Sequence, residues 1–295
     1  MIVHTFCPAC GDKNISPILS ANDHTVSNER FEIWECKNCT LRFTQNIPGK
    51  EAIGKYYQSE NYISHSDTSQ GFINNLYHKI RKRTLIQKRN LVEKATQKKA
   101  GDLLDVGCGT GAFLHTMKKA HWKITGLEPD ETAREKAWEL HGIQPEPAEV
   151  FYTLPVQSFD AITLLHVLEH VHDLQGYMDQ LKKLLRPSGK LFIAVPNYTS
   201  YDAQYYKESW AAYDVPRHLY HFSPGSMKKL FIAHGMKVAI MKPMWYDSIY
   251  VSMLSEPYKT GKSNAAKALM IGAISNSKAF MDVEKCSSVI YVGEG

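Results

Sequence analysis

The sequence predicts an α/β fold in which a mostly parallel sheet is covered by helices on both faces and is preceded by a small metal-binding module. Continuous apolar strands alternate with helical patterns from Asp102 onward, which is typical of parallel strands buried on both sides. A glycine-rich turn follows the first of these strands, and two pairs of cysteines precede them near the N-terminus.

The N-terminal cysteines have the spacing of a zinc site. Cys7 and Cys10 form one C-x2-C pair, and Cys36 and Cys39 form another after 25 intervening residues. Four thiolates match the ligand set of a tetrahedral, structural Zn(II) ion. Two disulfides are the alternative, but the N-terminus lacks the apolar stretch of a secretion signal. We predict a zinc ribbon over residues 1–45 that depends on its metal for folding.

Composition and charge limit the classes of protein to which the chain can belong. Hydrophobic residues make up 43% of the 295 positions, with 16 Tyr and 5 Trp, so the chain is not disordered. No apolar run approaches the roughly 18–20 residues that span a bilayer. We therefore expect a soluble, cytoplasmic protein.

The positive charge is concentrated in one segment. Nine basic residues and one acid, Glu93, lie between Leu76 and Lys99, so this segment has a charge of +8 within a total of +5. Its apolar spacing allows one or two helices within a linker over residues 46–100. We expect a solvated helical cap that attracts an anionic partner, such as a phosphate-bearing acceptor, a membrane surface or RNA.

The elements of the main domain follow in order from apolar periodicity and from turn and cap residues. Strands are predicted over residues 103–106, 123–127, 159–165, 190–195, 238–241 and 288–292. Helices are predicted after Gly111, after Asp130 with Ala133, Ala137 and Leu140 on the buried side, from about Asp173, and after the Ser223–Pro224 cap. Ligands of such sheets bind at the carboxyl ends of the strands.

The turn after the first strand predicts a nucleotide-like ligand. Gly107, Gly109 and Ala112 satisfy a dinucleotide fingerprint, and Glu128 stands where a ribose-binding acid belongs. Asp105 favours a different ligand, because its carboxylate would repel a pyrophosphate but attract an ammonium or a sulfonium group.

The string LLDVGCGTGAF at 103–113, together with GLEPD at 126–130, resembles the motifs of class I S-adenosylmethionine-dependent methyltransferases of the Methyltransf_23 type. The resemblance covers roughly residues 101–245. It implies a Rossmann-like domain over 101–295 with a seven-stranded sheet whose last strand is antiparallel, and with an insertion or lid over 246–286. It also implies that S-adenosylmethionine contacts Asp105, Gly107, Cys108, Gly109, Gly111, Glu128, Pro129, Glu149 and His166.

The string His166-Val-Leu-Glu169-His170 has the literal form of an inverted zinc-protease motif. That motif needs both histidines on one helical face, whereas His166 ends a predicted strand, so we exclude a protease. The stretch resembles ubiquinone-pathway O-methyltransferases, in which an E-x-x-E-H version has been linked to a divalent ion. Here His166 replaces the first acid. We expect hydrogen-bonded structural roles for Glu169 and His170, and we place His166 beside the methyl donor.

A histidine-rich segment over residues 210–224 follows the fifth strand. It is similar to deoxysugar C-methyltransferases, whose E-H-x-x-Y-F-S motif places a general-base histidine at His218, with Arg217 in place of the Glu. Imidazole is suited to proton removal near neutral pH. The candidate catalytic residues are His166, His218 and His221, and the candidate substrate residues are Trp210, Tyr213, Arg217 and Tyr220. Alternatively, the two histidines of this segment only hydrogen-bond a loop.

Residues 263–280 predict a helix beyond a minimal methyltransferase. Its apolar residues Ala266, Leu269, Met270, Ala273 and Ile274 gather on one side. Such a face suits a substrate lid, a membrane-facing helix or simple core packing.

The sequence thus predicts an S-adenosylmethionine-dependent methyltransferase (EC 2.1.1.-) that modifies O or C of a small sugar, glycan or isoprenoid-like acceptor. In one alternative, the zinc module and the basic segment together bind RNA, as in zinc-bearing ribosomal RNA methyltransferases. That alternative predicts that binding depends steeply on salt concentration. A second alternative is a non-catalytic scaffold that only binds the cofactor. Peripheral membrane contact fits the 263–280 helix, and the oligomeric state is left open.

Overall fold

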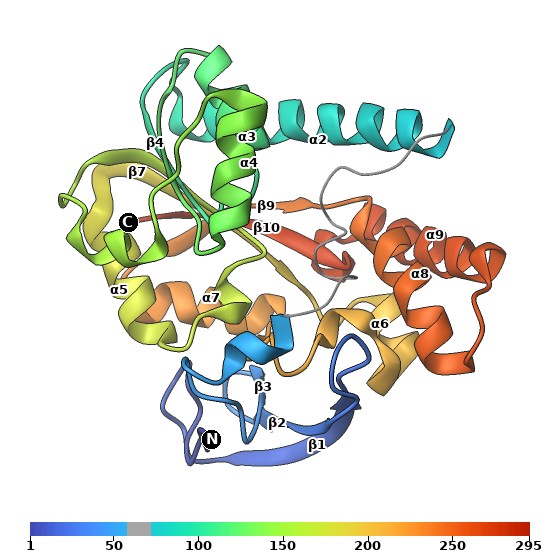
Figure 1. Ribbon diagram of the computed structural model, residues 1–295. Coiled ribbons are helices and arrows are strands. Elements are labelled where there is room, and N and C mark those ends of the chain that lie inside the picture. Colours follow the sequence, from blue (N-terminus) through green and yellow to red (C-terminus); the bar gives the residue numbers. More distant parts are fainter. Residues whose placement is uncertain (58–71) are drawn as a thin grey trace. The chain divides into compact units, whose positions relative to one another are not determined.

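The computed structural model describes residues 1–57 and 72–295, with side chains of its long basic helix described from Lys82 onward (Figure 1). The chain forms two compact units. Unit 1 contains Met1–Tyr62, His166–Tyr177 and Ala194–Tyr291, and unit 2 contains Ile63–Leu165, Met178–Ile193 and Val292–Gly295. The ribbon residues therefore belong to the same compact unit as most of the chain after Ala194. The domain boundaries proposed from the sequence stay predictions.

A four-stranded sheet of unit 1 joins the cysteine-rich module to the histidine-rich segment. Its strand order is β1 (Ile15–Asn22), β2 (Arg30–Cys36), β3 (Arg42–Thr44) and β8 (Tyr220–His221). In the antiparallel pairing of β3 with β8, Phe43 faces Tyr220 and Arg42 faces His221. The fourth strand of this small sheet thus comes from the far end of the sequence.

Helices and one further strand complete unit 1. They are η1 (Ile53–Tyr57), η3 (Leu168–His170), α6 (Tyr201–Tyr206), η4 (Lys207–Ser209), η5 (Ala211–Tyr213), α7 (Pro224–Ala233), β9 (Lys237–Pro243), α8 (Asp247–Thr260), α9 (Ala265–Met281) and η6 (Val283–Lys285). Ser223 caps α7, as the sequence predicted, and it does so through a reciprocal capping box with Ser226. Phe31 and Ile33 of β2 share one buried cluster with Tyr206 and Trp210, so ribbon and histidine-rich segment have a common core.

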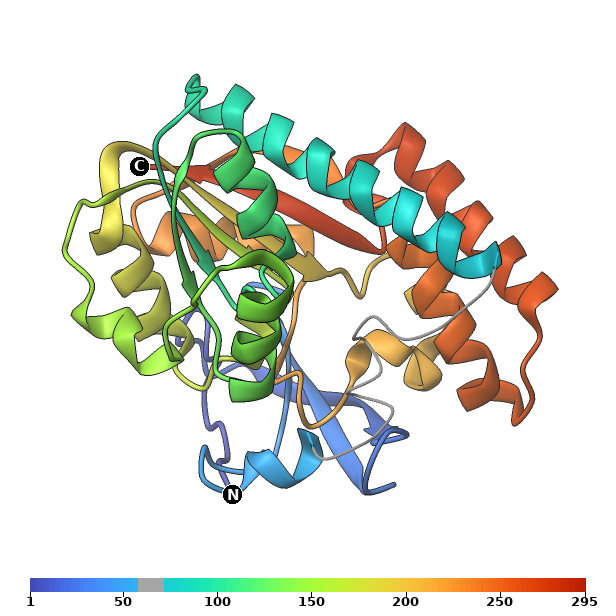
Figure 2. The same ribbon diagram turned by 45° about the horizontal axis from the view of Figure 1, so that its top comes forward.

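Unit 2 alternates strands and helices. It contains α2 (Phe72–Thr96), β4 (Asp102–Val106), α3 (Ala112–Lys119), β5 (Lys123–Leu127), α4 (Glu131–His141), η2 (Ala148–Thr153) and β6 (Phe159–Leu165). Three elements have residues in both units: α5 (Leu174–Leu184), β7 (Leu185–Pro196) and β10 (Ser288–Glu294). The helix α2 packs beside α3, as Figure 2 shows. The predicted strands over 123–127 and 159–165 match β5 and β6 to the residue.

The main sheet has the order β5-β4-β6-β7-β10-β9. β4 pairs in parallel with β5 and with β6. β10 runs antiparallel to β7, because Asn197 after the end of β7 bonds to Ser287 before the start of β10, and Lys190 near the start of β7 contacts Glu294 at the end of β10. The antiparallel strand implied by the resemblance is present.

The seventh strand implied by the resemblance is absent from the described part of this sheet, which has six strands. In its place beside β5 is a single parallel bridge between Leu127 and Glu146. Pro145 and Pro147 flank Glu146, and neither has an N–H to donate to a ladder. The sheet therefore has six strands among the described residues instead of the expected seven, for a reason that is visible in the sequence.

One predicted helix face differs from the structure, and the apolar face of a second helix, for which a lid, a membrane contact and core packing were all left open, is exposed. Leu140 of α4 is 52% exposed although its spacing predicted burial. On α9 the predicted apolar face is on the outside, with Leu269 49% and Met270 53% exposed. Periodicity identifies a face, but only the packing partners decide whether that face is the buried one. In the described residues, no helix combines the length and apolarity needed to cross a bilayer.

Candidate functional site

The glycine-rich turn of unit 2 has the backbone conformation that glycine permits. Gly107, Gly109 and Gly111 have φ of 68°, 53° and 75°, in the left-handed region that other residues rarely adopt. The loop is held to the neighbouring strand because the N–H groups of Gly107 and Cys108 both donate to the Leu127 carbonyl, at 2.7 and 3.0 Å. Nothing lies within 4 Å of a Cβ built on Gly109, so this backbone is open to a ligand.

Asp105 lies at the end of β4, just before that turn, and is 3% exposed. Its Oδ1 accepts a hydrogen bond of 2.5 Å from Thr163 Oγ1 on β6. Burial raises the pKa of Asp105 to about 7, and the Thr163 bond and the charge of Lys88 offset only part of that effect. A buried carboxylate whose pKa remains raised despite these contacts is a suitable partner for a positively charged ligand group.

Glu128 follows β5 and reaches back to the glycine turn. Its Oε2 accepts from the Gly109 N–H at 2.8 Å, and its Oε1 accepts from the Asp130 N–H at 3.0 Å. Burial raises the pKa of Glu128 despite these two bonds. A carboxylate has about four acceptor positions, so the two bonds leave capacity for two ribose hydroxyls. The structure thus brings Asp105, the glycine turn and Glu128 together at one edge of unit 2.

Three other residues of unit 2, Pro129, Cys108 and Glu149, were predicted to contact the cofactor. The Pro129 carbonyl accepts from Arg134 at 2.9 Å. Burial raises the pKa of Cys108, so its thiol is not a nucleophile. Glu149 is an exposed residue of η2, and its proximity to an adenine stays a prediction.

His166 lies in unit 1 directly after β6 and has a positive φ of 61°. Its ring lies between two acids, with Nδ1 3.4 Å from Glu169 Oε1 and Nε2 3.1 Å from Asp247 Oδ2. Burial opposes its charge, but the two carboxylates outweigh burial and raise the pKa of His166 to about 10. A protonated imidazole cannot accept a proton, so this geometry favours a positioning role. No motif in the sequence pointed to Asp247 as its partner.

The second cluster of unit 1 combines Glu169, His170 and His218. One carboxylate oxygen and one nitrogen from each imidazole lie within 4.8 Å of one another. His218 Nδ1 is 2.9 Å from the Ala212 carbonyl, and His170 Nδ1 is 3.1 Å from the Arg217 carbonyl and 3.0 Å from Tyr57 Oη. A carbonyl only accepts, so both Nδ1 atoms are assigned the proton and both Nε2 atoms present a lone pair.

Glu169 adds a buried carboxylate to this cluster. It is fully buried, and among the described residues neither of its oxygens receives a hydrogen bond. Burial lowers the pKa of His170 to about 4, so that ring is neutral at pH 7. A carboxylate and two imidazole lone pairs thus converge, and the charge of Glu169 is balanced by the protonated His166, whose Nδ1 lies 3.4 Å from Glu169 Oε1. Such a set attracts a proton, and it also matches a divalent-metal ligand set of two imidazoles and a carboxylate.

His221 has a different environment. Thr44 Oγ1 donates to the His218 carbonyl at 2.8 Å and lies 3.1 Å from His221 Nε2. Because the hydroxyl proton is already used, His221 Nε2–H is assigned as the donor. Burial lowers the pKa of His221 well below its usual value. The contact favours a structural role that ties β8 to the ribbon.

The predicted substrate residues are buried and hydrogen-bonded within unit 1. Arg217, 1% exposed, donates to Asp214 at 2.6 Å and to Asp23 at 2.9 Å. Tyr213 Oη accepts from Arg42 at 2.9 Å, the Trp210 indole donates to Asp202 at 2.9 Å, and Tyr220 Oη donates to the His172 carbonyl at 3.2 Å.

Three of these side chains, from Trp210, Tyr213 and Arg217, line a hollow of about 10 Å³, which suits at most a single water. An acceptor would need these side chains to move. Contact of the four predicted residues with substrate stays a prediction.

The four N-terminal cysteines converge as the sequence predicted. Cys7 Sγ is 3.4 Å from Cys39 Sγ, and Cys10 Sγ is 3.6 Å from Cys36 Sγ. All four are free thiols, and their sulfurs lie within 4.8 Å of one another. Sulfurs bound to one zinc at about 2.3 Å are separated by just under 4 Å in a tetrahedron. The cluster is therefore compatible with a structural zinc ion.

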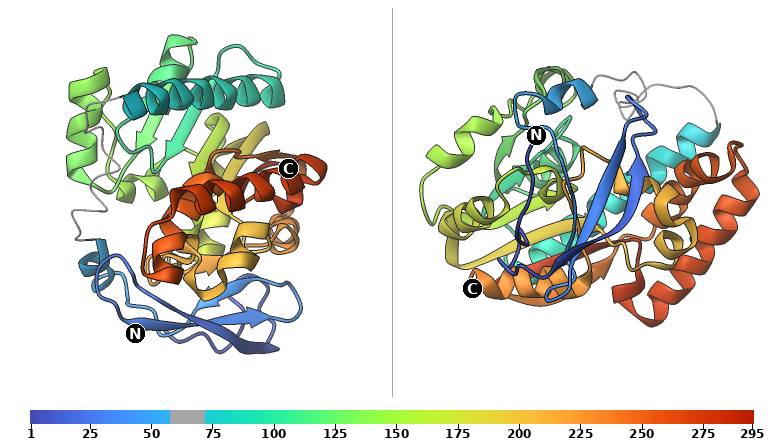
Figure 3. Two further views of the ribbon diagram at one scale, coloured as in Figure 1. Left: turned by 90° about the vertical axis from the view of Figure 1, so that its right-hand side faces the viewer. Right: turned by 90° about the horizontal axis from the view of Figure 1, so that it is seen from below.

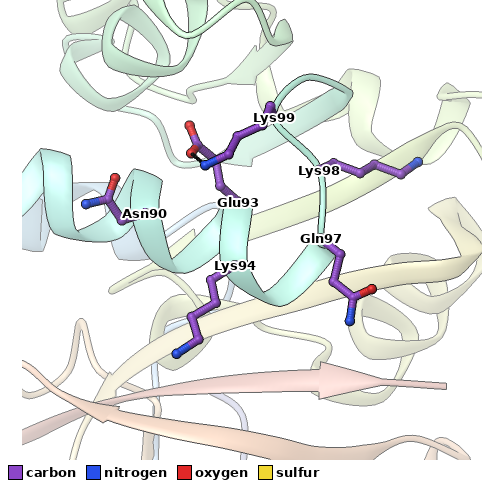
Figure 4. Close-up of a pocket in the computed structure, with 6 residues that line it drawn as sticks. All are labelled: Asn90, Glu93, Lys94, Gln97, Lys98 and Lys99. Atoms are coloured by element: carbon purple, nitrogen blue, oxygen red, sulfur yellow. Dashed lines mark hydrogen bonds and ion pairs between the residues drawn. The ribbon is translucent and has the colours of Figure 1, made fainter.

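The basic segment is partly neutralised in unit 2. Lys98 and Arg186 bond to Asp160 at 2.5 and 2.6 Å, and Lys99 contacts Glu93 at 3.0 Å. A hollow of about 360 Å³ lies at the end of α2, lined by Asn90, Glu93, Lys94, Gln97, Lys98 and Lys99 (Figure 4). The negative end of the helix dipole and an acid border this hollow, and both disfavour an anion. It includes none of the predicted site residues.

Residues 77–239 match the Methyltransf_23 family model, described as "Methyltransferase domain". A ubiquinone biosynthesis O-methyltransferase of Actinobacillus pleuropneumoniae is 36% identical over 109 residues, which cover 33% of this chain and 46% of that protein. The protein of the same name from Saccharophagus degradans is 30% identical over 116 residues, covering 37% and 49%. The chain thus spans about half the length of the curated relatives it matches.

Among solved structures, an S-adenosylmethionine-dependent methyltransferase from Archaeoglobus fulgidus is similar, with a TM-score of 0.50 and 16% identity. The match covers 76% of this chain and 100% of the other. At that identity the match concerns the fold alone, and it agrees with the Rossmann-like arrangement of the main sheet.

Proposed function

Because the chain belongs to the S-adenosylmethionine-dependent methyltransferase family, we propose that it transfers a methyl group from that cofactor to a hydroxyl oxygen of a small-molecule acceptor. The names of the similar proteins support oxygen as the acceptor atom. Transfer to carbon, which the histidine-rich segment suggested, is the alternative.

The observation on which the proposal chiefly rests is the joint placement of Asp105, Gly109 and Glu128. The buried carboxylate of Asp105 and the open, positive-φ backbone of Gly109 fit a ligand with a cationic end. When bound, S-adenosylmethionine supplies an electrophilic methyl group on a sulfonium. Asp105 would hold the ammonium and sulfonium side, and Glu128 would hold the ribose hydroxyls through its remaining lone pairs.

The proton of the acceptor hydroxyl needs a base, and His218 is the proposed one. Its Nδ1–H is held by the Ala212 carbonyl at 2.9 Å, which leaves Nε2 with the lone pair. The imidazolium formed by proton transfer would be stabilised by Glu169 and by Asp214, whose Oδ2 lies 4.0 Å from Nε2. His166, already protonated between two acids, would position its neighbours and remain charged throughout.

A cofactor-binding measurement tests the proposal before any acceptor is known. S-adenosylmethionine at about 100 times its Kd should stabilise the zinc-loaded protein by about 2.7 kcal/mol, which calorimetry or dye-based melting detects. Glu128→Ala should abolish the shift, whereas Glu131→Ala, at an exposed position in the first turn of α4, should leave it unchanged. A shift that survives Glu128→Ala would contradict the cofactor assignment.

An acceptor screen separates the remaining functions. Small-molecule, lipid and RNA fractions are incubated with labelled cofactor, and methyl acceptance by small polar or lipid molecules is expected. Acceptance by RNA alone, with steep salt dependence, would favour the RNA alternative. Cofactor binding without turnover on any fraction would favour the non-catalytic scaffold. Lys98 and Lys99 are neutralised by acids, which counts against RNA binding at that end of α2.

A further inference from the structure

The helix hairpin of α8 and α9 in unit 1 exposes large apolar side chains. Figure 3 (left) shows α9 at the front of the hairpin, without another element in front of it. Phe280 is 84% and Met281 88% exposed, and Met253 of α8 is 47% exposed. Such residues are normally buried, so a cluster of them on one hairpin needs an explanation.

The burial pattern of α9 is the reverse of that of an ordinary amphipathic helix. Its buried positions are mostly small: Ala268, Ile271, Gly272, Ser275 and Ala279. A Cβ built on Gly272 would lie 2.8 Å from the Ile249 Cα, so α8 approaches at backbone distance. The large apolar residues are therefore kept on the outside by the close packing of the two helices, and the core has no room for them.

The outer residues of α9 form parallel stripes. Leu269 and Phe280, Met270 and Met281, and Lys267 and Lys278 are three pairs in which the partners are eleven residues apart. Eleven residues are close to three helical turns, so each pair lies along one line parallel to the helix axis. At 100° per residue, the lysine line borders the Met270–Met281 line. The helix thus presents two apolar stripes with a cationic stripe along one edge.

Lysines outnumber acids around this face, which Glu256 and Asp282 border. Residues 257–281 contain Lys259, Lys262, Lys267 and Lys278 and no acidic residue. The ammonium groups of Lys267 and Lys278 lie 5.7 and 5.1 Å from the ring centres of Tyr205 and Tyr201, and Lys267 also contacts Glu256 at 3.2 Å. Rings do not neutralise a cation, so most of the positive charge persists beside the apolar stripes.

We propose that the α8–α9 hairpin binds an anionic lipid bilayer, with Leu269, Met270, Phe280 and Met281 in the interface and the lysines at the level of the headgroups. An apolar stripe beside a row of lysines is the arrangement of helices that lie in the plane of a membrane. The lack of acids over 257–281 favours an anionic surface over a neutral one. This inference does not depend on the methyl transfer proposed above.

Vesicle sedimentation tests the proposal with the full-length, zinc-loaded protein. Vesicles of phosphatidylcholine with phosphatidylglycerol should bind the protein, and vesicles of phosphatidylcholine alone should bind it much more weakly. Phe280→Ser combined with Met281→Ser should weaken partitioning at least about tenfold. Lys262→Glu, in the exposed turn of the hairpin, should weaken binding only to the anionic vesicles.

Ile232→Ser is the matched control, because Ile232 is 67% exposed on α7 of the same unit and lies outside the hairpin. It should leave partitioning unchanged, and melting temperatures report that all variants fold. Absence of vesicle binding, or binding unaffected by the double variant, would overturn the proposal. A concentration-dependent dimer that Phe280→Ser dissociates, without vesicle binding, would assign the face instead to a second copy of the chain.

Discussion

Two buried aspartates of unit 2 show how strongly the environment sets the pKa of a carboxyl group. Asp105 and Asp160 are each 3% exposed. Asp160 is bonded to Lys98 and Arg186, and these contacts outweigh burial and lower its pKa. Asp105 has Thr163 as its hydrogen-bond donor, and burial raises its pKa to about 7. The first carboxylate already has its cations, whereas the second has room for one from a ligand.

The raised pKa of Asp105 predicts a pH dependence of cofactor binding. The ionised carboxylate attracts a cation, so below about pH 7, where Asp105 is increasingly protonated, affinity for S-adenosylmethionine should fall by up to about tenfold per pH unit. Titration calorimetry at pH 6 and pH 8 measures this difference. Asp105→Asn should bind weakly at both values. A wild-type affinity that is equal at both values would contradict the assignment.

The acceptor cluster around His218 predicts a second residue-scale effect. His218→Ala should lower kcat by about 10²–10⁴ with little change in cofactor Kd, because general-base catalysis contributes about that factor. His172→Ala is the control, since His172 lies in the same unit, 3.1 Å from the Pro48 carbonyl, and outside the cluster. Activity that is lost on mild chelation while the ribbon zinc stays bound, and that a divalent ion restores, would instead assign Glu169, His170 and His218 to a metal.

At the level of elements, the sequence predicted most of the strands because buried parallel strands are continuous apolar runs with clear turns at their ends. β5 and β6 match their predicted ranges, and Ser223 caps α7 as expected. The strand that is reduced to a bridge at Glu146 is explained by its flanking prolines. The side of α9 that faces the protein could not be predicted, because it depends on the backbone approach of Ile249 to Gly272.

That close approach predicts the effect of enlarging one glycine. Gly272→Leu should force α8 and α9 apart and lower the free energy of unfolding by about 1–3 kcal/mol, as overpacking does. Ala273→Leu, one residue away on the exposed side of the same helix, should have almost no effect. Denaturant unfolding measures both. Equal stability of the two variants would show that the hairpin can open without cost.

At the level of the whole molecule, the candidate sites are assembled from distant parts of the sequence. Gly109 and Glu128 were predictable as a pair, because both follow neighbouring parallel strands at the same edge of the sheet. The contacts of His218 were not predictable, since Thr44 comes from the ribbon and Ala212 from a short helix. Asp247, the partner of His166, is the first residue of α8, where the sequence offered no comparable motif.

The pairing of β3 with β8 predicts that zinc supports more than the ribbon. Purified protein should contain one zinc per chain, and Cys36→Ser should lose it together with the order of β1–β3. Because Thr44 bonds to the His218 carbonyl and its N–H to that of Leu219, amide exchange at residues 217–222 should rise as well. Elemental analysis and hydrogen exchange measure both effects. A folded, zinc-free Cys36→Ser protein would contradict the structural role.

The same pairing has a consequence for biosynthesis. Phe43 and its partner Tyr220 are 177 positions apart, so at about 5–20 residues per second the ribbon waits roughly 10–35 s on the ribosome before its fourth strand exists. During that interval the sheet has an open edge that a nascent neighbour could occupy. Early capture of zinc by the four thiolates would keep the first three strands in register until the histidine-rich segment emerges.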